Sequence, residues 1–179
     1  IESLADCITL SGGPEDARLV VKDAAALAAR MDGLIREGVF GDSEAKAAAR
    51  WIIGEAAQDL GVRPASIQEL YMAMGRGEID RWFTVPAINL RVLTYDSARA
   101  VFRAAKAIGA GAFIFESARS EIGYTDQRPA EYSAAVLAAA IREGFRGPVF
   151  IQGDHFQTSG KKYAADPAKE IQAIRGLIT

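Results

Sequence analysis

The sequence predicts an α/β fold in which a parallel sheet is built from repeated strand–helix units. Two features of the second half of the chain support this prediction. From Phe83 onward, short apolar runs alternate with stretches of helical periodicity, in three units of about 30 residues each. In the run 112–116 the first four residues are all apolar, as expected for a strand that is buried on both faces.

Each of the three units consists of a predicted strand followed by a predicted helix. The strands are expected at 83–90, 112–116 and 148–152. The helices are expected from Asp96 or Ser97 to Gly109, from Pro129 to about Gly144, and at 168–178 after Asp166 and Pro167. The stretches 117–128 and 158–165 are predicted as polar loops.

The first part of the chain, residues 14–79, is predicted to be helical throughout. The three helices are expected from Pro14 to Glu37, from an N-cap at Asp42 or Ser43 to Gly61, and from an N-cap at Ser66 to about Gly75. We therefore divide the chain into an N-terminal helical segment, 1–65, and a strand–helix part, 66–179.

Composition limits the classes of partner and the compartment. The net charge of −2 gives no electrostatic reason to expect nucleic acid or a membrane as partner. No run reaches the roughly 18 apolar residues of a membrane span, and the first residues lack the pattern of a signal peptide. A single cysteine, Cys7, excludes an internal disulfide framework. We expect a cytoplasmic protein.

Polar residues gather at the C-terminal ends of the predicted strands: Asn89, Glu116, Ser117, Asp154 and His155. Active sites of doubly wound sheets and of barrels both lie at this edge, so both architectures stay open. No glycine-rich phosphate fingerprint follows the first strand, which disfavours a nucleotide-binding fold. Asp154 and His155 could divide the work between metal or substrate binding and proton transfer. In extended backbone their side chains are predicted to point to opposite sides.

Each candidate also has a purely structural interpretation. Asp154 and His155 could simply end a strand, and Asn89 could either bind substrate or hold the following turn. His155 is the only histidine, whereas a catalytic zinc commonly has three protein ligands, so this chain alone does not complete a three-histidine site. Lys161 and Lys162 lie in a polar stretch rather than an apolar pocket, which weighs against a Schiff-base mechanism.

Two segments resemble the class II ketose-bisphosphate aldolases. The run 83–90, FTVPAINL, is similar to that family's first strand, and 151–155, IQGDH, to its third-strand Asp-His motif. The resemblance implies an aldolase-type TIM (β/α) barrel, of which this chain holds the first three β/α units after its N-terminal helical segment. It implies that Asp154 is the catalytic proton-transfer residue, that His155 is a zinc ligand, and that Ser117 contacts substrate. The remaining zinc ligands would lie outside this chain.

The segments 116–120, ESARS, and 153–155, GDH, are also similar to the second subunit of bacterial tagatose-bisphosphate aldolase, which is regarded as non-catalytic. The leading expectation is a metal-dependent lyase that makes or cleaves a carbon–carbon bond in a phosphorylated ketose. The alternative is a non-catalytic barrel subunit that stabilises a partner aldolase. A different sugar-phosphate enzyme on the same barrel is a third hypothesis. We expect a homo-oligomer or a complex with a partner aldolase subunit.

Overall fold

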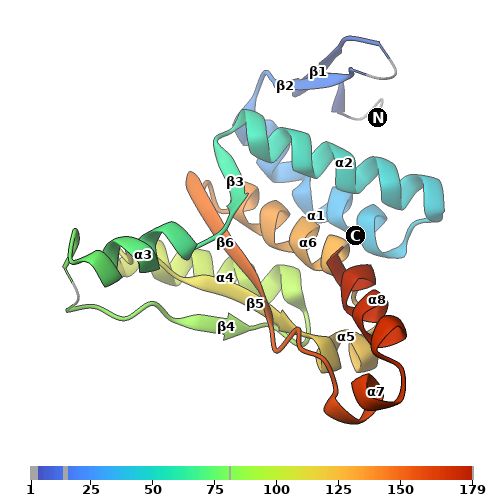
Figure 1. Cartoon of the computed structure of the whole chain (residues 1–179). Helices are drawn as coiled ribbons and strands as arrows, with labels where there is room; N and C mark the ends of the chain where they lie inside the picture. Colours follow the sequence, from blue (N-terminus) through green and yellow to red (C-terminus); the bar gives the residue numbers. More distant parts are fainter. Residues whose placement is uncertain (1–3, 14–15, 81, 179) are drawn as a thin grey trace.

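The chain folds around a four-stranded parallel sheet with the strand order β3-β6-β5-β4 (Figure 1). A computed structural model describes residues 4–13, 16–80 and 82–178. The strands are β3 (Val62–Ala65), β4 (Ala87–Asn89), β5 (Ile114–Ala118) and β6 (Gly147–Asp154). The predicted α/β class with a parallel sheet is therefore confirmed.

Four helices lie on one side of the sheet, with α6 at their centre. They are α1 (Ala24–Phe40), α2 (Ser43–Asp59), α4 (Thr94–Ile108) and α6 (Pro129–Arg142), with α6 in contact with the other three and with β3 and β5. The remaining helices are α3 (Gln68–Arg76), α5 (Arg119–Thr125), α7 (Gly160–Ala165) and α8 (Pro167–Ile178). Figure 1 shows α5, α7 and α8 together, near the end of the sheet to which β5 points.

The core lies between the sheet and this helical layer. Phe102 of α4 is fully buried, and its ring centroid lies 5.1 Å from that of Phe115 and 4.9 Å from that of Phe145. Phe113 joins the same aromatic group. Residues from the predicted segments 1–65 and 66–179, such as Met31 and Phe102, belong to one continuous core.

The opposite face of the sheet is much less covered. Ile114, Phe150 and Gln152 lie on this face, because they alternate with the core residues Phe115 and Val149. Together with Tyr71 of α3 and the residues just before that helix, the first three line a small hollow of about 130 Å³. Beyond α3, this face is left open.

The N-terminal segment is not helical throughout, which corrects the prediction for residues 14–79. Strands β1 (Ile8–Ser11) and β2 (Arg18–Val21) form an antiparallel pair, and α1 begins only at Ala24 with Asp23 as its N-cap. The predicted first helical residue, Pro14, lies outside the described residues. Leu19 is buried whereas Val20 is exposed, which is the period-two pattern of a strand.

Strand β3 is a second correction in the same region. It pairs in parallel with the first half of β6, although Pro64 and its neighbours were predicted as a connection between helices. Proline has no N–H to donate to a sheet, so it is tolerated on an edge strand. Because β3 is at the edge and only four residues long, it has almost no periodic signal of its own.

Several helix boundaries that were predicted from single residues agree with the structure. Asp42 caps α2 by accepting a hydrogen bond from the Ala45 N–H at 2.9 Å, Gly109 ends α4 in the left-handed conformation, and Pro129 is the first residue of α6. The predicted polar loops 117–128 and 158–165 instead contain the short helices α5 and α7. In the described part of the chain, no helix is long and apolar enough to cross a membrane.

Removing the Phe102 ring is expected to lower the free energy of unfolding by about 3–5 kcal/mol in Phe102→Ala, because the cavity cannot be refilled by the surrounding rings. Phe102→Leu, which keeps more apolar volume, is expected to lose less. Urea denaturation followed by circular dichroism measures both. Trp82→Ala is the control, since Trp82 is 94% exposed and its loss should change stability by no more than about 0.5 kcal/mol. Equal losses in the Phe102→Ala and Trp82→Ala variants would contradict the assignment of the core.

Candidate functional site

The C-terminal ends of β4, β5 and β6 carry a row of polar side chains on the open face of the sheet. Parallel register places Asn89 beside Glu116, and Glu116 beside Gln152. One step further along, Asp154 of β6 lies beside Ala118 of β5. Side chains that are paired across parallel strands share one face, so three neighbouring strands present their polar groups together.

Asn89 connects two carboxylates that are far apart in the sequence. Its amide Nδ2 donates to Asp154 Oδ2 at 3.2 Å and to Glu121 Oε2 at 3.2 Å. Glu121 belongs to α5, so one amide joins the ends of β4 and β6 to this helix. The structure therefore brings together Asn89 and Asp154, which the sequence predicted separately.

Glu121 is the most deeply buried acid of this group, with a side chain only 7% exposed. Besides Asn89, it accepts hydrogen bonds from the Ala118 N–H at 2.8 Å and from Arg91 Nε at 2.6 Å. Burial by itself raises the pKa of Glu121, but the hydrogen bonds from Ala118, Asn89 and Arg91 outweigh it, so the pKa is lowered overall. Glu121 is a fixed negative charge that orients its donors.

Glu116 and Gln152 form a second polar pair on the same face. Gln152 Nε2 donates to Glu116 Oε2 at 2.6 Å, and Glu116 is buried. From the helical side, the Tyr132 hydroxyl donates to the Glu116 backbone carbonyl at 2.8 Å. Burial raises the pKa of Tyr132 to well above its usual range, so this hydroxyl stays protonated as a donor. The end of β5 is thereby held from both faces.

His155 follows β6 in an unusual conformation. Its φ of +50° lies in the left-handed region, which few residues other than glycine adopt. The ring folds back so that Nε2 lies 3.3 Å from Asp154 Oδ1, and the side chain is 73% exposed. The expectation that these side chains point to opposite sides is therefore wrong, because the extended backbone ends at Asp154.

Gly153 and Phe156 complete this turn. A Cβ placed on Gly153 would lie only 2.6 Å from the Phe156 ring, so the ring occupies space that a side chain would need. Phe156 packs across the end of β6, so that a residue with a Cβ at position 153 would collide with its ring. The turn that carries Asp154 and His155 is thus compact, and it depends on a residue without a side chain at 153.

Ser117 is buried but lies on the other face of the sheet. It alternates with Glu116 along β5 and shares a face with Phe115, which packs in the helical core. The structure consequently does not bring Ser117 together with Asn89 and Asp154. Its predicted contact with substrate stays a prediction.

A partly buried ion pair ties the segment after His155 to α5. Arg119 Nη1 donates to Glu170 Oε1 of α8 at 2.7 Å and to the Gln157 carbonyl at 3.0 Å. The Ser159 N–H also donates to Glu170, at 2.8 Å. Hydrogen bonds from Arg119 and Ser159 lower the pKa of Glu170 to about 2. The turn at 153–156 is therefore followed by a backbone that is firmly held.

A metal site would have few ligands here. Within the described residues, no three His, Cys, Asp or Glu side chains are grouped so that they could hold an ion. Cys7 is buried at the far end of the chain, where its thiol donates to the Leu4 carbonyl. His155 and Asp154 thus offer one imidazole and one carboxylate, which fits part of a metal site.

Sequence patterns did not single out Glu121 or Arg91. Glu121 was visible only as one acid in a polar run, and Arg91 only as a residue in a stretch without glycine. One pattern in the sequence could have identified Glu121: it lies three residues after Ala118, the last residue of a strand. At this spacing the carboxylate can accept a hydrogen bond from the free N–H at the start of the next helix.

Comparison with known proteins identifies no relative: neither a family model, nor a curated protein, nor a solved structure matches the chain.

Asn89→Asp is expected to lower the free energy of unfolding by about 1–3 kcal/mol at pH 7.5, because a third carboxylate would replace the shared donor. The carboxylates of Asp154 and Glu121 raise the pKa of the introduced carboxyl group in the folded protein above its value in the unfolded chain. The loss of stability therefore develops as pH rises through the folded pKa. The loss should be smaller at pH 4.5, as measured by urea denaturation. Asn89→Ala is the control that removes the donor without adding charge. Equal losses in both variants at both pH values would contradict the cluster.

Glu170→Gln is expected to lower the melting temperature at pH 6, because the ion pair with Arg119 is lost. The folded pKa of Glu170, about 2, is below the usual value near 4.5, so its contribution is complete above about pH 4.5 and is lost as pH falls towards 2. Thermal scans should show the difference between variant and parent shrinking from pH 6 to pH 3. Glu37→Gln, at an exposed position of α1, is the matched control and should show no such trend.

Proposed function

We propose that this chain is part of an aldolase-type (β/α) barrel whose site makes or cleaves a carbon–carbon bond in a phosphorylated ketose with the help of a divalent metal. The observation that carries the proposal is the hydrogen bond between Asn89 and Asp154. It joins the ends of two parallel strands at the sheet edge where barrel enzymes hold their catalytic groups. Strands β4, β5 and β6 are neighbours in chain order, as in a barrel, whereas β3 departs from that order because it pairs with the other edge of β6.

Asp154 is the proton-transfer group in this proposal. Asn89 holds Oδ2, while Oδ1 contacts the exposed ring of His155. Since His155 has no other recorded partner among the described residues, its ring can turn towards a ligand and leave Oδ1 free for a substrate hydroxyl. Asn89 then keeps the carboxylate in one orientation while Oδ1 takes the proton.

His155 would provide one metal ligand, and the others would come from outside the described residues. A bound Zn²⁺ would polarise the substrate carbonyl and neutralise the charge that develops on its oxygen. The exposed imidazole is available for such a role, since within the described residues it would give up its contact with Asp154 and no other polar contact. Glu121 supports the site indirectly, because it fixes Asn89.

A non-catalytic barrel subunit is the second candidate, and one observation favours it. Both oxygens of Asp154 are already engaged, and His155 is directed towards Asp154 rather than towards a group of further ligands. In this hypothesis, the polar row of Asn89, Asp154 and Glu121 only stabilises the end of the sheet. The chain would then support a partner aldolase without acting on substrate itself.

The two candidates differ in what Asp154→Ala does to turnover. In the enzymatic hypothesis, the full-length protein with Zn²⁺ releases triose phosphate from fructose 1,6-bisphosphate or tagatose 1,6-bisphosphate, and the variant loses about two to four powers of ten in kcat. A coupled NADH assay measures this release. Activity should also disappear after treatment with EDTA and return when Zn²⁺ is added.

Lys161→Ala is the control, since Lys161 is exposed on α7 and has no part in the proposed chemistry. Its activity should equal that of the parent protein. Activity that survives complete metal removal, or a loss in Lys161→Ala as large as in Asp154→Ala, would overturn the metal-dependent mechanism. Unchanged activity of a complex carrying Asp154→Ala would support the non-catalytic subunit.

A further inference from the structure

A second hollow, distinct from the sheet edge, lies where the ends of α1 and α5 meet the starts of α4 and α6. Its volume is about 570 Å³, within the usual range of small-molecule sites, and its walls come from all four helices and from the loop after β4. Nothing in the proposed chemistry of Asp154 uses this cavity. It therefore requires an explanation of its own.

Large apolar side chains surround the cavity while remaining exposed. Phe40 is 80% exposed, Val92 73%, Leu93 74% and Tyr124 65%. Single exposed apolar residues are ordinary, but four that line one hollow from three separate segments are characteristic of a binding site. An apolar part of a ligand would find contacts on several sides here.

The loop that carries two of these side chains is held in a strained conformation. Leu93 has a φ of +49°, in the left-handed region that costs a residue with a Cβ of order 1–3 kcal/mol. The Leu93 carbonyl accepts the Ser97 N–H at 2.9 Å, which fixes the loop to the first turn of α4. Strain of this kind is found where a side chain must be presented for binding, and Leu93 is presented at the cavity.

The carboxylates of the cavity wall are already engaged. Asp32 accepts the Tyr95 hydroxyl at 2.5 Å and lies 3.4 Å from Arg142. Glu131 is paired with Arg50 at 2.6 Å, and Asp96 lies 3.7 Å from Arg99. These acids therefore add little net negative charge to the cavity, because each is matched by a cation outside it.

The two arginines that line the cavity, Arg36 and Arg91, have fewer ion-pair partners than these acids. Among the described residues, no carboxylate lies within ion-pair distance of Arg36, which is exposed. Arg91 is 58% exposed and uses Nε for Glu121, so the remainder of its guanidinium group is available at the cavity. The floor adds a neutral polar pair, since the Thr94 hydroxyl donates to Gln127 Oε1 at 2.7 Å.

We propose that this cavity binds a small amphipathic anion, with an aromatic or branched apolar body among Phe40, Leu93 and Tyr124 and a phosphate or carboxylate group at Arg36 and Arg91. The apolar rim lies on the same hollow as Arg36 and the part of the Arg91 guanidinium group that does not contact Glu121, which is the combination that such a ligand requires. The inference does not depend on aldolase activity.

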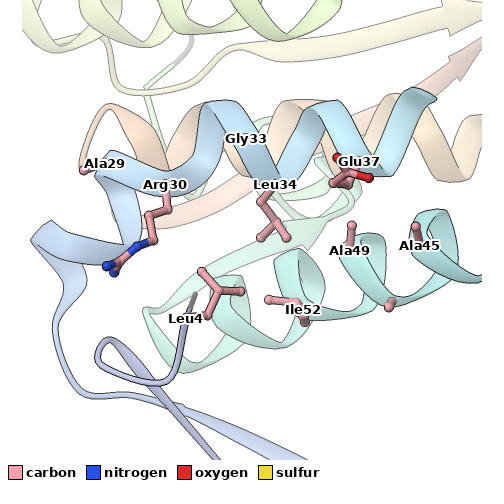
Figure 2. A pocket seen from close by; sticks show the side chains of 10 residues that line it. Leu4, Ala29, Arg30, Gly33, Leu34, Glu37, Ala45, Ala49 and Ile52 are labelled. Atoms are coloured by element: carbon pink, nitrogen blue, oxygen red, sulfur yellow. The ribbon is translucent and has the colours of Figure 1, made fainter. Parts of the chain in front are cut away.

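The other large hollow, between α1 and α2, lacks this combination. Its volume is about 640 Å³, and Figure 2 shows Leu34 of α1 directed towards α2, with Ala45 and Ala49 directed back towards α1. Arg30 is the only cation among its lining residues and is already paired with Asp6. Small apolar residues alone do not select a ligand.

Titration with 1-naphthyl phosphate, followed by isothermal calorimetry, tests the proposal. Binding should saturate at one molecule per chain, and Arg36→Gln or Phe40→Ala should each weaken it about tenfold or more, since a charged hydrogen bond or an apolar contact is lost. Arg91 is not substituted, because it also holds Glu121. The matched controls are Arg63→Gln on β3 and Trp82→Ala, both exposed and away from the cavity; neither should alter the affinity.

Two neutral or cationic analogues test the charge. 1-Naphthol and 1-naphthylmethylamine share the ring but lack the anion, so they should bind at least about tenfold more weakly than the phosphate. Equal affinities for the three compounds, no binding of the phosphate at millimolar concentration, or equal effects of Arg36→Gln and Arg63→Gln would overturn the proposal. So would a dimer in sedimentation equilibrium that Phe40→Ala dissociates, because a second copy would then cover the cavity.

Discussion

Helix α6 is the element on which the rest of the structure depends. Nine of its fourteen residues are buried, and most of these are alanine: Tyr132, Ala134, Ala135, Val136, Leu137, Ala138, Ala139, Ala140 and Ile141. Small side chains let α1, α2, α4 and the sheet all approach one helix closely. A helix with larger side chains at these positions would separate the helical layer from the sheet.

The position of α6 is transmitted to the candidate site through Tyr132. Its hydroxyl holds the Glu116 carbonyl, and the end of β5 in turn provides the Ala118 N–H that Glu121 accepts. Glu121 then orients Asn89, and Asn89 orients Asp154. The chain of contacts runs from a packed core to a polar edge. The geometry at Asp154 is therefore set by burial of α6, many residues away in the sequence.

The sequence predicted those parts of the fold that are encoded locally. Asp42 and Pro129 act on the helix turn that they start, so their roles could be recognised from neighbouring residues. Strand β3 could not be found in this way, because its partner β6 begins more than eighty residues later and Pro64 is a poor strand signal. The predicted class, and the polar residues Asn89 and Asp154 at the strand ends, came from patterns that repeat along the chain.

In the candidate site, too, some residues could be recognised from the local sequence and others only from the folded structure. Asn89 and Asp154 were visible as polar residues after apolar runs, whereas Glu121 acquires its importance only from donors at positions 89, 91 and 118. The left-handed backbone of His155 depends on the turn that Gly153 and Phe156 close. No periodicity in the sequence reports such a conformation.

Asp154 and His155 differ in how firmly the fold holds them, and this difference bears on function. Asp154 is fixed through Asn89 to a buried carboxylate, and the backbone beyond the turn is fixed through Glu170 to Arg119. His155 lies between these two fixed points, yet its ring is exposed, and in the described part of the chain its polar contact is with the neighbouring Asp154. Because the ring is exposed and the turn beneath it is rigid, the ring can bind a new partner without a rearrangement of the surrounding backbone. Whether the site acts on a substrate or only stabilises an assembly is therefore decided by what engages His155, since the rest of the polar row is already satisfied within the chain.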